Sequence, residues 1–367
     1  MNRKEKLIVG RMLYAMLIGG VLWTLVNVEE ILNTDASYAV PLETAATAVP
    51  DTEELPLTTT EMPADAYRPV RLTFAGSCTT GSMLGSASYG TFNELLDSDG
   101  AEYFLRKLDF LFHTDDLTVA GCNVTLSDRD DLPPAERDTL SWFRGPAGAA
   151  RIFSEGGIDA LSLHAPHPWD YGADGYSDTK TALEASALRW GDHGKAIYTT
   201  IEGADIAVYC RYVDDPSDAE NVLAWLETAG SYDFTALYIL TPETASDLPD
   251  DDRRTMLRSF ADAGADLVFA TDAQRIQPAE QWGDSMILYS AGSLLDGRTK
   301  YPSPYTVLCG VELQVLDSEI LNIEYTLTPC RTYDDDHPWR PHTLSDPAEY
   351  DVVTAFLAGN RETPFLD

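Results

Sequence analysis

The side chains best suited to chemistry lie in one short stretch near the middle of the sequence. His164, His167 and Asp170 follow the apolar run 158–163, and the prolines at 166 and 168 prevent a helix directly after the first histidine. The run predicts a buried strand that ends in a polar loop, which is where α/β proteins place their sites. His167 and Asp170 are therefore the candidate catalytic residues.

Imidazole and carboxylate groups together suit a divalent metal such as zinc or manganese. A single metal could be held by His164, His167, Asp170 and Asp272. The alternative is that both histidines cap strand and loop ends through hydrogen bonds, while Asp170 and Asp174 cap turns. Loose clusters of this kind are common, so we expect no cofactor and keep one divalent metal as the alternative.

The elements that would position this loop alternate between strands and helices, which predicts a layered α/β domain over residues 68–330. Strands are expected at 70–75, 117–120, 158–163, 205–209, 234–240, 266–270 and 285–290, with a hairpin over 305–327. Helices are expected from about residue 101, over the stripe Leu183, Ala187 and Trp190, from Ser217, and from Pro249 to Gly264. The tail 331–367 is rich in Pro and Asp, which predicts an irregular or flexible end.

Composition and charge narrow the class of protein. The chain has 367 residues, 44% of them apolar, which is enough for a sizeable core. Sixty acidic residues against 25 basic ones give a formal charge of −35. This charge repels nucleic acid and anionic lipid, so we expect no nucleic-acid partner.

The N-terminal region predicts a membrane segment. Basic residues at 3, 4, 6 and 11 accompany an apolar run over 7–28, close to the about 20 residues that cross a bilayer. Residues 1–6 would be cytoplasmic, 7–28 a transmembrane signal-anchor, and the bulk of the chain extracytoplasmic. A cleaved signal peptide ending at Ser37-Tyr38-Ala39 is the alternative. Residues 29–67 contain nine acids and four prolines without Lys or Arg, which predicts an extended linker.

The five cysteines are too few for a disulfide scaffold and match no zinc spacing. Cys309 and Cys330 could face each other across the predicted hairpin, or both could be reduced core residues. Cys78 and Cys122 end two predicted strands. Either could form a nucleophilic pair with His167, but packing or a disulfide is the simpler expectation.

The central stretch resembles the Asn-Asn-His-x-x-Asp-Tyr-Gly-x-x-Gly signature of the CapA family, poly-γ-glutamate capsule proteins with a calcineurin-like metallophosphoesterase fold. His167, Asp170, Tyr171, Gly172 and Gly175 match the signature, and Ala165 and Pro166 replace its two Asn residues. The resemblance spans roughly residues 70–300 and includes the run Tyr289-Ser-Ala-Gly-Ser-Leu294. It implies an αββα sandwich after one N-terminal transmembrane helix.

The resemblance also indicates which residues stand at the family's metal-ligand positions. Those residues are Ser77, Asn123, Pro166, His167, Leu240, Asp272, Gln274 and Ser293. Asn123 replaces a Glu in an ungapped reading, and a shifted reading would place Thr125 there instead. Only His167 keeps the family's residue type, and Asp272 is the only acid. We expect six of these side chains to converge at one edge of a sheet, namely those of Ser77, Asn123, His167, Leu240, Asp272 and Gln274.

Neutral Ser, Asn, Leu and Gln side chains cannot supply the negative charge that holds two divalent cations. The replaced ligands therefore predict a pseudoenzyme, a membrane-anchored CapA-like protein that binds or assembles components in capsule, poly-γ-glutamate or other surface-polymer biosynthesis. Its expected partners are the membrane, a surface polymer and capsule biosynthesis proteins. The alternative is an enzyme, either a metal-dependent phosphoesterase with a reduced metal site or a polymer-transfer enzyme.

Overall fold

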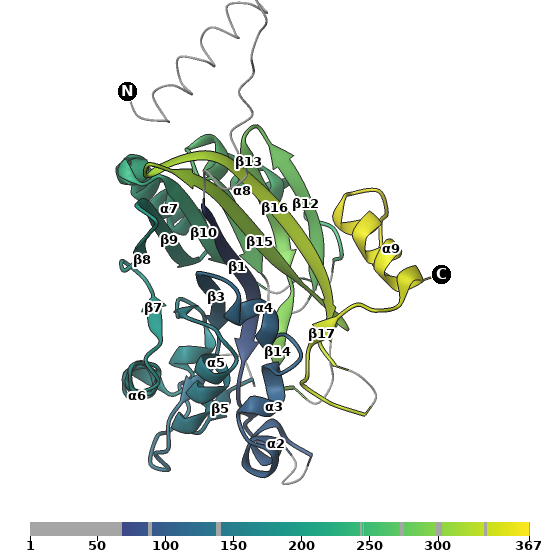
Figure 1. Cartoon of the computed structure of the whole chain (residues 1–367). Helices are drawn as coiled ribbons and strands as arrows, with labels where there is room; N and C mark the ends of the chain where they lie inside the picture. Colours follow the sequence, from purple (N-terminus) through teal and green to yellow (C-terminus); the bar gives the residue numbers. More distant parts are fainter. Residues whose placement is uncertain are drawn as a thin grey trace, which may run out of the picture. The chain divides into compact units, whose positions relative to one another are not determined.

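The apolar runs of the sequence form two β-sheets that pack face to face (Figure 1). The computed structural model describes residues 68–86, 90–136, 141–242, 244, 246–271, 275–298, 303–333 and 336–366. All of them belong to one compact unit, Tyr67–Asp367. The predicted anchor 7–28 and linker 29–67 lie outside the described residues. In the part of the chain that is described, every helix is too short or too polar to span a bilayer.

The first sheet has parallel strands on one side, which end at the edge strand β7 (Arg189–Gly191), and a long antiparallel hairpin on the other. Its order is β17 (His342–Thr343), β16 (Glu319–Arg331), β15 (Tyr305–Leu316), β1 (Arg68–Thr79), β3 (Leu117–Cys122), β6 (Ala160–Ser162) and β7, and β14 (Ser293–Asp296) also pairs with β1. The two-residue turn Asp317-Ser318 joins β15 to β16 with positive φ at both residues, as tight hairpins require. The predicted hairpin is confirmed.

The second sheet is parallel except at its two edges. Its order is β12 (Ile276–Trp282), β13 (Ser285–Ala291), β11 (Leu267–Thr271), β10 (Phe234–Leu240), β9 (Ala204–Tyr212) and β8 (Ile197–Ile201). A small third sheet contains β2 (Ser82–Met83), β5 (Phe143–Gly145) and β4 (Thr125–Leu126).

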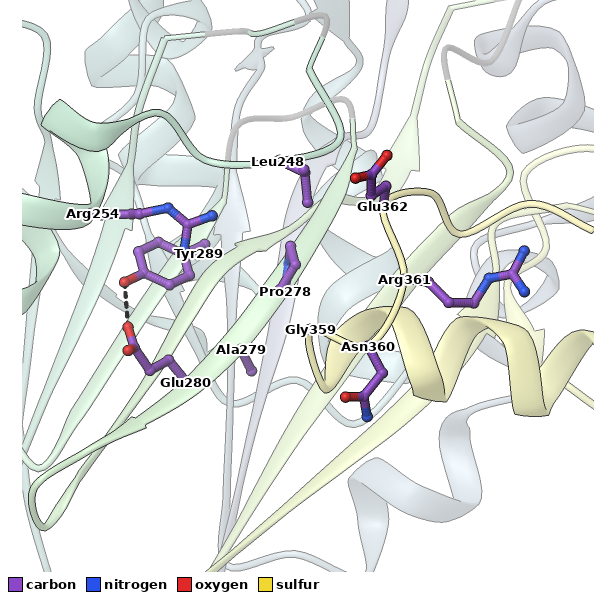
Figure 2. Close-up of a pocket in the computed structure, with 10 residues that line it drawn as sticks. All are labelled: Leu248, Arg254, Pro278, Ala279, Glu280, Tyr289, Gly359, Asn360, Arg361 and Glu362. Carbon is purple, nitrogen blue, oxygen red and sulfur yellow. Dashed lines mark hydrogen bonds between the residues drawn. The ribbon is translucent and has the colours of Figure 1, made fainter.

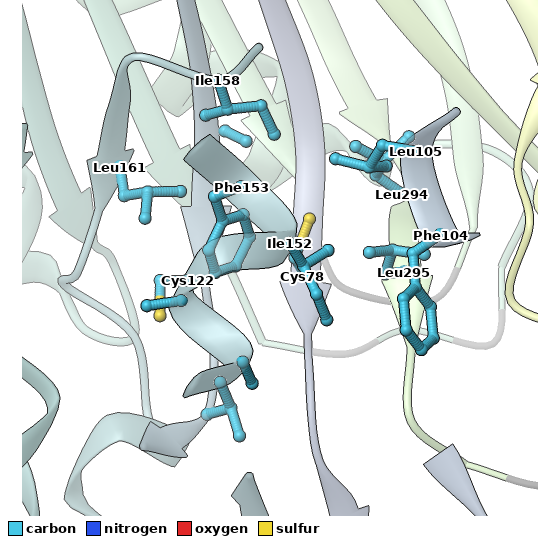
Figure 3. Close-up of a cluster of buried hydrophobic side chains, with 14 of the residues drawn as sticks. Cys78, Phe104, Leu105, Cys122, Ile152, Phe153, Ile158, Leu161, Leu294 and Leu295 are labelled. Carbon is cyan, nitrogen blue, oxygen red and sulfur yellow. The ribbon is translucent and has the colours of Figure 1, made fainter. Parts of the chain in front are cut away.

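Helices cover both outer faces, which confirms the predicted layered α/β architecture. The helices are α2 (Phe92–Asp99), α3 (Glu102–Leu105), α4 (Asp109–His113), α5 (Arg151–Glu155), α6 (Gly172–Ala185), α7 (Pro216–Thr228), α8 (Asp251–Asp262) and α9 (Pro347–Leu357), with short 3-10 turns η2 (Ala147–Ala150), η3 (His167–Trp169) and η4 (Ala229–Ser231). Apolar side chains of α2 to α6 pack on the first sheet (Figure 3), and those of α7 and α8 pack on the second.

Two predicted elements differ from the structure. The stripe Leu183, Ala187 and Trp190 is not one helix, because α6 ends at Ala185 and Trp190 lies in β7. Ala187 has φ +59°, and the Leu188 amide donates to the Leu183 carbonyl at 3.0 Å, which closes the helix. The tail 331–367 is not irregular throughout, since it contains β17 and α9.

The layer between the sheets is mainly apolar and also contains buried hydrogen bonds that join the sheets. Phe74 of β1 and Phe269 of β11 have ring centroids 5.8 Å apart. Tyr238 of β10 lies beside Phe269, and its hydroxyl donates to the Ala75 carbonyl of β1 at 2.9 Å. Because Tyr238 is 1% exposed, this hydrogen bond joins the two sheets away from water.

We predict that Tyr238→Phe lowers the free energy of unfolding by about 1 to 3 kcal/mol, because it removes a buried hydrogen bond and leaves a carbonyl oxygen without that donor. Tyr350→Phe, on an exposed side chain, is the control and should change stability by less than about 0.5 kcal/mol. Urea unfolding of both variants checks this. Equal effects would show that the link between the sheets contributes little.

Candidate functional site

The carboxyl ends of the parallel strands meet at one edge, where the chain passes from the second sheet to the first. β13 ends at Ala291, Gly292 follows with φ +67°, and Ser293 begins β14. Ser77 of β1 pairs with Ser293 and with Gly121 of β3. A Cβ atom at Gly76 would lie 2.2 Å from the Gly292 carbonyl oxygen, so only glycine allows this approach.

Leu240 lies at the same edge of the second sheet. Phe234, Ala236 and Tyr238 of β10 face the first sheet, so the strand's alternation turns Leu240 to the same side. Leu240 pairs with Thr271 of β11, whose hydroxyl donates to the Gly292 carbonyl at 2.7 Å. Ser77 and Leu240 thus lie at strand ends on this edge, and the convergence of the six predicted side chains stays a prediction. Asp272 and Gln274 lie outside the described residues.

His167 lies in the loop that follows β6 of the first sheet. The His167 backbone amide donates to the side-chain oxygen Oδ1 of Asn123 at 3.0 Å. The backbone amide of Asn123 in turn donates to the Cys78 carbonyl at 2.8 Å. The His167 Nδ1 lies 3.0 Å from Asp170 Oδ2, and Asp170 is fully buried. Asp170 also accepts from the Phe143 amide. The carboxylate thus fixes the imidazole orientation and caps the loop.

His164 faces the second sheet rather than His167's carboxylate. Its Nδ1 accepts a hydrogen bond of 2.8 Å from the Tyr212 amide, at the end of β9. Burial, with the positive Arg211 and the nearby His193, lowers the pKa of His164 to about 4. Arg211 contacts His193 and donates to Asp218 at 2.6 Å. The sequence analysis did not single out this Arg211 group, since its members come from separate elements.

The described residues do not fit a metal pair. Ser77 and Leu240 offer a hydroxyl and a hydrocarbon, and the Asn123 amide oxygen is engaged by the His167 backbone. Pro166 supplies no side-chain donor atom. Within the described ranges, no three His, Cys, Asp or Glu side chains group closely enough to share a metal ion. In particular, His164 and His167 have different partners, which favours the capping interpretation of both.

The cysteines near this edge face away from it. Cys78 and Cys122 pair across β1 and β3, are fully buried, and point into the helix-covered core (Figure 3). Both are free thiols, and burial raises the pKa of Cys122 to about 12 and that of Cys78 further. They are core residues rather than nucleophiles. Cys309 and Cys330 are free too, because they pair with Leu327 and Thr306 and not with each other.

An exposed row of rings and cations begins two residues after His167. The Trp169 indole is 45% exposed and stacks on Tyr176 with centroids 4.1 Å apart. The Lys180 ammonium lies 4.6 Å from the Tyr176 centroid, and the Lys195 ammonium lies 3.4 Å from that of Trp190. We call these five residues the aromatic row. The sequence analysis did not single out the aromatic row.

The sequence of this region identifies the family to which the chain belongs. A family model described as "Bacterial capsule synthesis protein PGA_cap" matches residues 71–298. The chain belongs to this family. The match confirms the predicted resemblance and covers every strand end described above. It also covers His167 and the aromatic row, so the PGA_cap region contains the whole candidate site.

Individual relatives of this PGA_cap chain are distant. The PGA biosynthesis protein CapA of Bacillus subtilis (strain 168) is 20% identical over 255 residues, 63% of this chain and 66% of that relative, slightly less than two thirds of its length. A hypothetical protein of Thermus thermophilus gives a TM-score of 0.42 at 12% identity, covering 71% of this chain and 99% of that one. The calcineurin-like phosphoesterase YfkN from Bacillus subtilis gives 0.37 at 10% identity, covering 71% and 90%. The family assignment rests on the sequence match.

We predict that stability falls as the pH decreases from about 6.5 towards 4, partly through His164. In this range the unfolded histidine takes up a proton, whereas the folded one, with a pKa of about 4, does not. His164→Asn keeps an acceptor for the Tyr212 amide but cannot titrate. Urea unfolding at pH 7 and pH 4.5 should show a smaller loss for this variant than for the wild type. An unchanged loss would contradict the assignment.

Proposed function

We propose that this chain is a non-catalytic CapA-like module that binds or assembles components in capsule, poly-γ-glutamate or other surface-polymer biosynthesis. Family membership supports the capsule context. The single observation that carries the non-catalytic role is the pair Ser77 and Leu240. They occupy strand ends where the family resemblance expects an acid and a histidine, and Leu240 fills its position with hydrocarbon, 4% exposed.

The proposal places the module outside the cytoplasm on a single-pass anchor. Its basis is the sequence pattern of residues 1–28, with basic residues before the apolar run and acids after it. The linker 29–67 carries only negative charge, so self-repulsion would extend it between the bilayer and residues 68–367. Protease accessibility of the linker in intact cells tests this arrangement.

An active enzyme is the second candidate, and the His167–Asp170 pair is the observation that favours it. A buried carboxylate that orients an imidazole is a common arrangement in acid–base catalysis. The same geometry also caps a loop, because Asp170 accepts from the Phe143 amide and Asn123 accepts from the His167 amide. The two candidates therefore predict different consequences when His167 is changed.

We predict that the purified chain holds no stoichiometric divalent metal after mild dialysis and hydrolyses simple phosphoesters no faster than buffer with added metal. Two close cations require bridging anions, which Ser77 and Leu240 do not supply. Ser77→Asp alone should not restore activity, because Leu240 still lacks a donor atom. Metal analysis and an aryl phosphate assay check both statements. Two metal equivalents, with hydrolysis abolished in His167→Ala, would establish the enzyme instead.

The aromatic row is the surface that we assign to the polymer. The chain as a whole repels a polyanion because its formal charge is −35. Lys180 and Lys195 are two of the three lysines in the described residues, the third being Lys107, and neither forms an ion pair there. The Lys180 ammonium lies over Tyr176, on which the exposed Trp169 stacks, and the Lys195 ammonium lies over Trp190. The row thus combines two positive groups with stacking surface.

We predict that changing Lys180 and Lys195 to Gln weakens poly-γ-glutamate binding by about fivefold to thirtyfold in Kd, since each exposed charge contributes about 0.5 to 1 kcal/mol. Lys107→Gln, on an exposed residue of the same charge, is the control and should bind as the wild type does. Co-sedimentation with the polymer at constant ionic strength measures both. Equal weakening in all variants would mean that net charge, and not the row, governs binding.

A further inference from the structure

A cavity lies between the second sheet and the C-terminal segment (Figure 2). It has a volume of about 370 Å³, at the small end of the range for ligand sites. Pro278 and Tyr289 of the second sheet, Leu248 and Arg254 beside or on α8, and Asn360 and Glu362 after α9 line it. Tyr289 packs with the α7 and α8 side chains, so this cavity opens on the helix-covered face.

The acid in the cavity floor is fully engaged. Glu280 accepts two hydrogen bonds from Arg258, at 3.0 and 2.8 Å, and one from the Tyr289 hydroxyl at 2.6 Å. Burial opposes ionisation of Glu280, but these donors lower its pKa, while burial and Glu280 raise the pKa of Tyr289 to about 12. At neutral pH the Glu280 charge is therefore balanced by Arg258.

The positive charge of Arg254 also acts on Glu280, but Arg254 does not bond that carboxylate. It lies one helical turn before Arg258 on α8, and its guanidinium sits 5.5 Å from the Tyr289 centroid. Among the described residues it forms no ion pair. Glu362 forms none there either, although Figure 2 shows it on the opposite side of the cavity. The lining therefore contains two cations, Arg254 and Arg361, and two acids, Glu280 and Glu362. Arg254 and Glu362 lie on either side of the apolar side chains of Leu248 and Pro278.

We propose that this cavity binds a small zwitterion, an α-amino acid or dipeptide. The carboxylate is held by the Arg254 guanidinium, whose planar donors match it in a two-point hydrogen bond. The ammonium group lies near Glu362, and the aliphatic body packs on Leu248 and Pro278. Opposite charges on two sides of one cavity favour a ligand that carries both.

Titration calorimetry of the full-length chain with alanyl-alanine tests this site. Alanyl-alanine amide lacks the carboxylate and N-acetyl-alanyl-alanine lacks the ammonium group, and each should bind at least tenfold more weakly. Arg254→Gln should weaken alanyl-alanine binding at least tenfold, with Arg254→Lys intermediate because it keeps charge but not the planar donors. Glu362→Gln should remove the preference for alanyl-alanine over its N-acetyl form.

Arg189→Gln provides the matched control, because Arg189 is an exposed arginine of β7 without an ion pair in the described residues. It should bind alanyl-alanine as the wild type does, and all variants should melt within a few degrees of the wild type. Absence of alanyl-alanine binding to the wild type would overturn the proposal. So would equal binding by the amide form, or unchanged binding in a folded Arg254→Gln variant.

Discussion

The close approach of Gly76 and Gly292 is the constraint on which the rest of the site depends. The chain leaves the second sheet at Ala291 and joins the first at Ser293, so one peptide carbonyl must fit against β1. This crossing brings the carboxyl ends of both sets of parallel strands to one edge. Ser77 and Leu240 therefore lie at strand ends along this edge for reasons of backbone packing, whatever side chains they carry. The scaffold can persist after its ligands have been replaced.

Much of this fold could be predicted because buried strands leave a strong signal. β10 was expected at 234–240 and is observed over Phe234–Leu240, since a fully buried strand requires an unbroken apolar run. Helix ends were less clear. The α9 helix was missed because the Pro- and Asp-rich composition of the tail dominated the interpretation. Yet Asp346 caps this helix and Pro347 occupies its first turn, which is a recognised start signal.

The candidate site was only partly predictable. Spacing and resemblance placed Ser77, Asn123 and His167 at strand ends, because topology fixes such positions. The hydrogen-bond and ring partners of each side chain depend on tertiary packing, which cannot be read from the local sequence. His164 pairs with the Tyr212 amide of another element, and Lys195 lies over Trp190 only because the turn between Asp192 and Lys195 folds the chain back. The sequence does not show which arginine of α8 bonds Glu280, and in the structure it is Arg258 rather than Arg254.

The five cysteines give the chain a particular relation to oxidants. All are buried free thiols, including the cross-strand neighbours Cys78 and Cys122, in a chain for which the pattern of residues 1–28 predicts export. A buried thiol with a raised pKa forms little thiolate, so the folded protein resists oxidation even without disulfides. The unfolded chain has no such protection. In an oxidising compartment, rapid folding would therefore keep these cysteines reduced, and any chain that folds slowly would be open to non-native crosslinks.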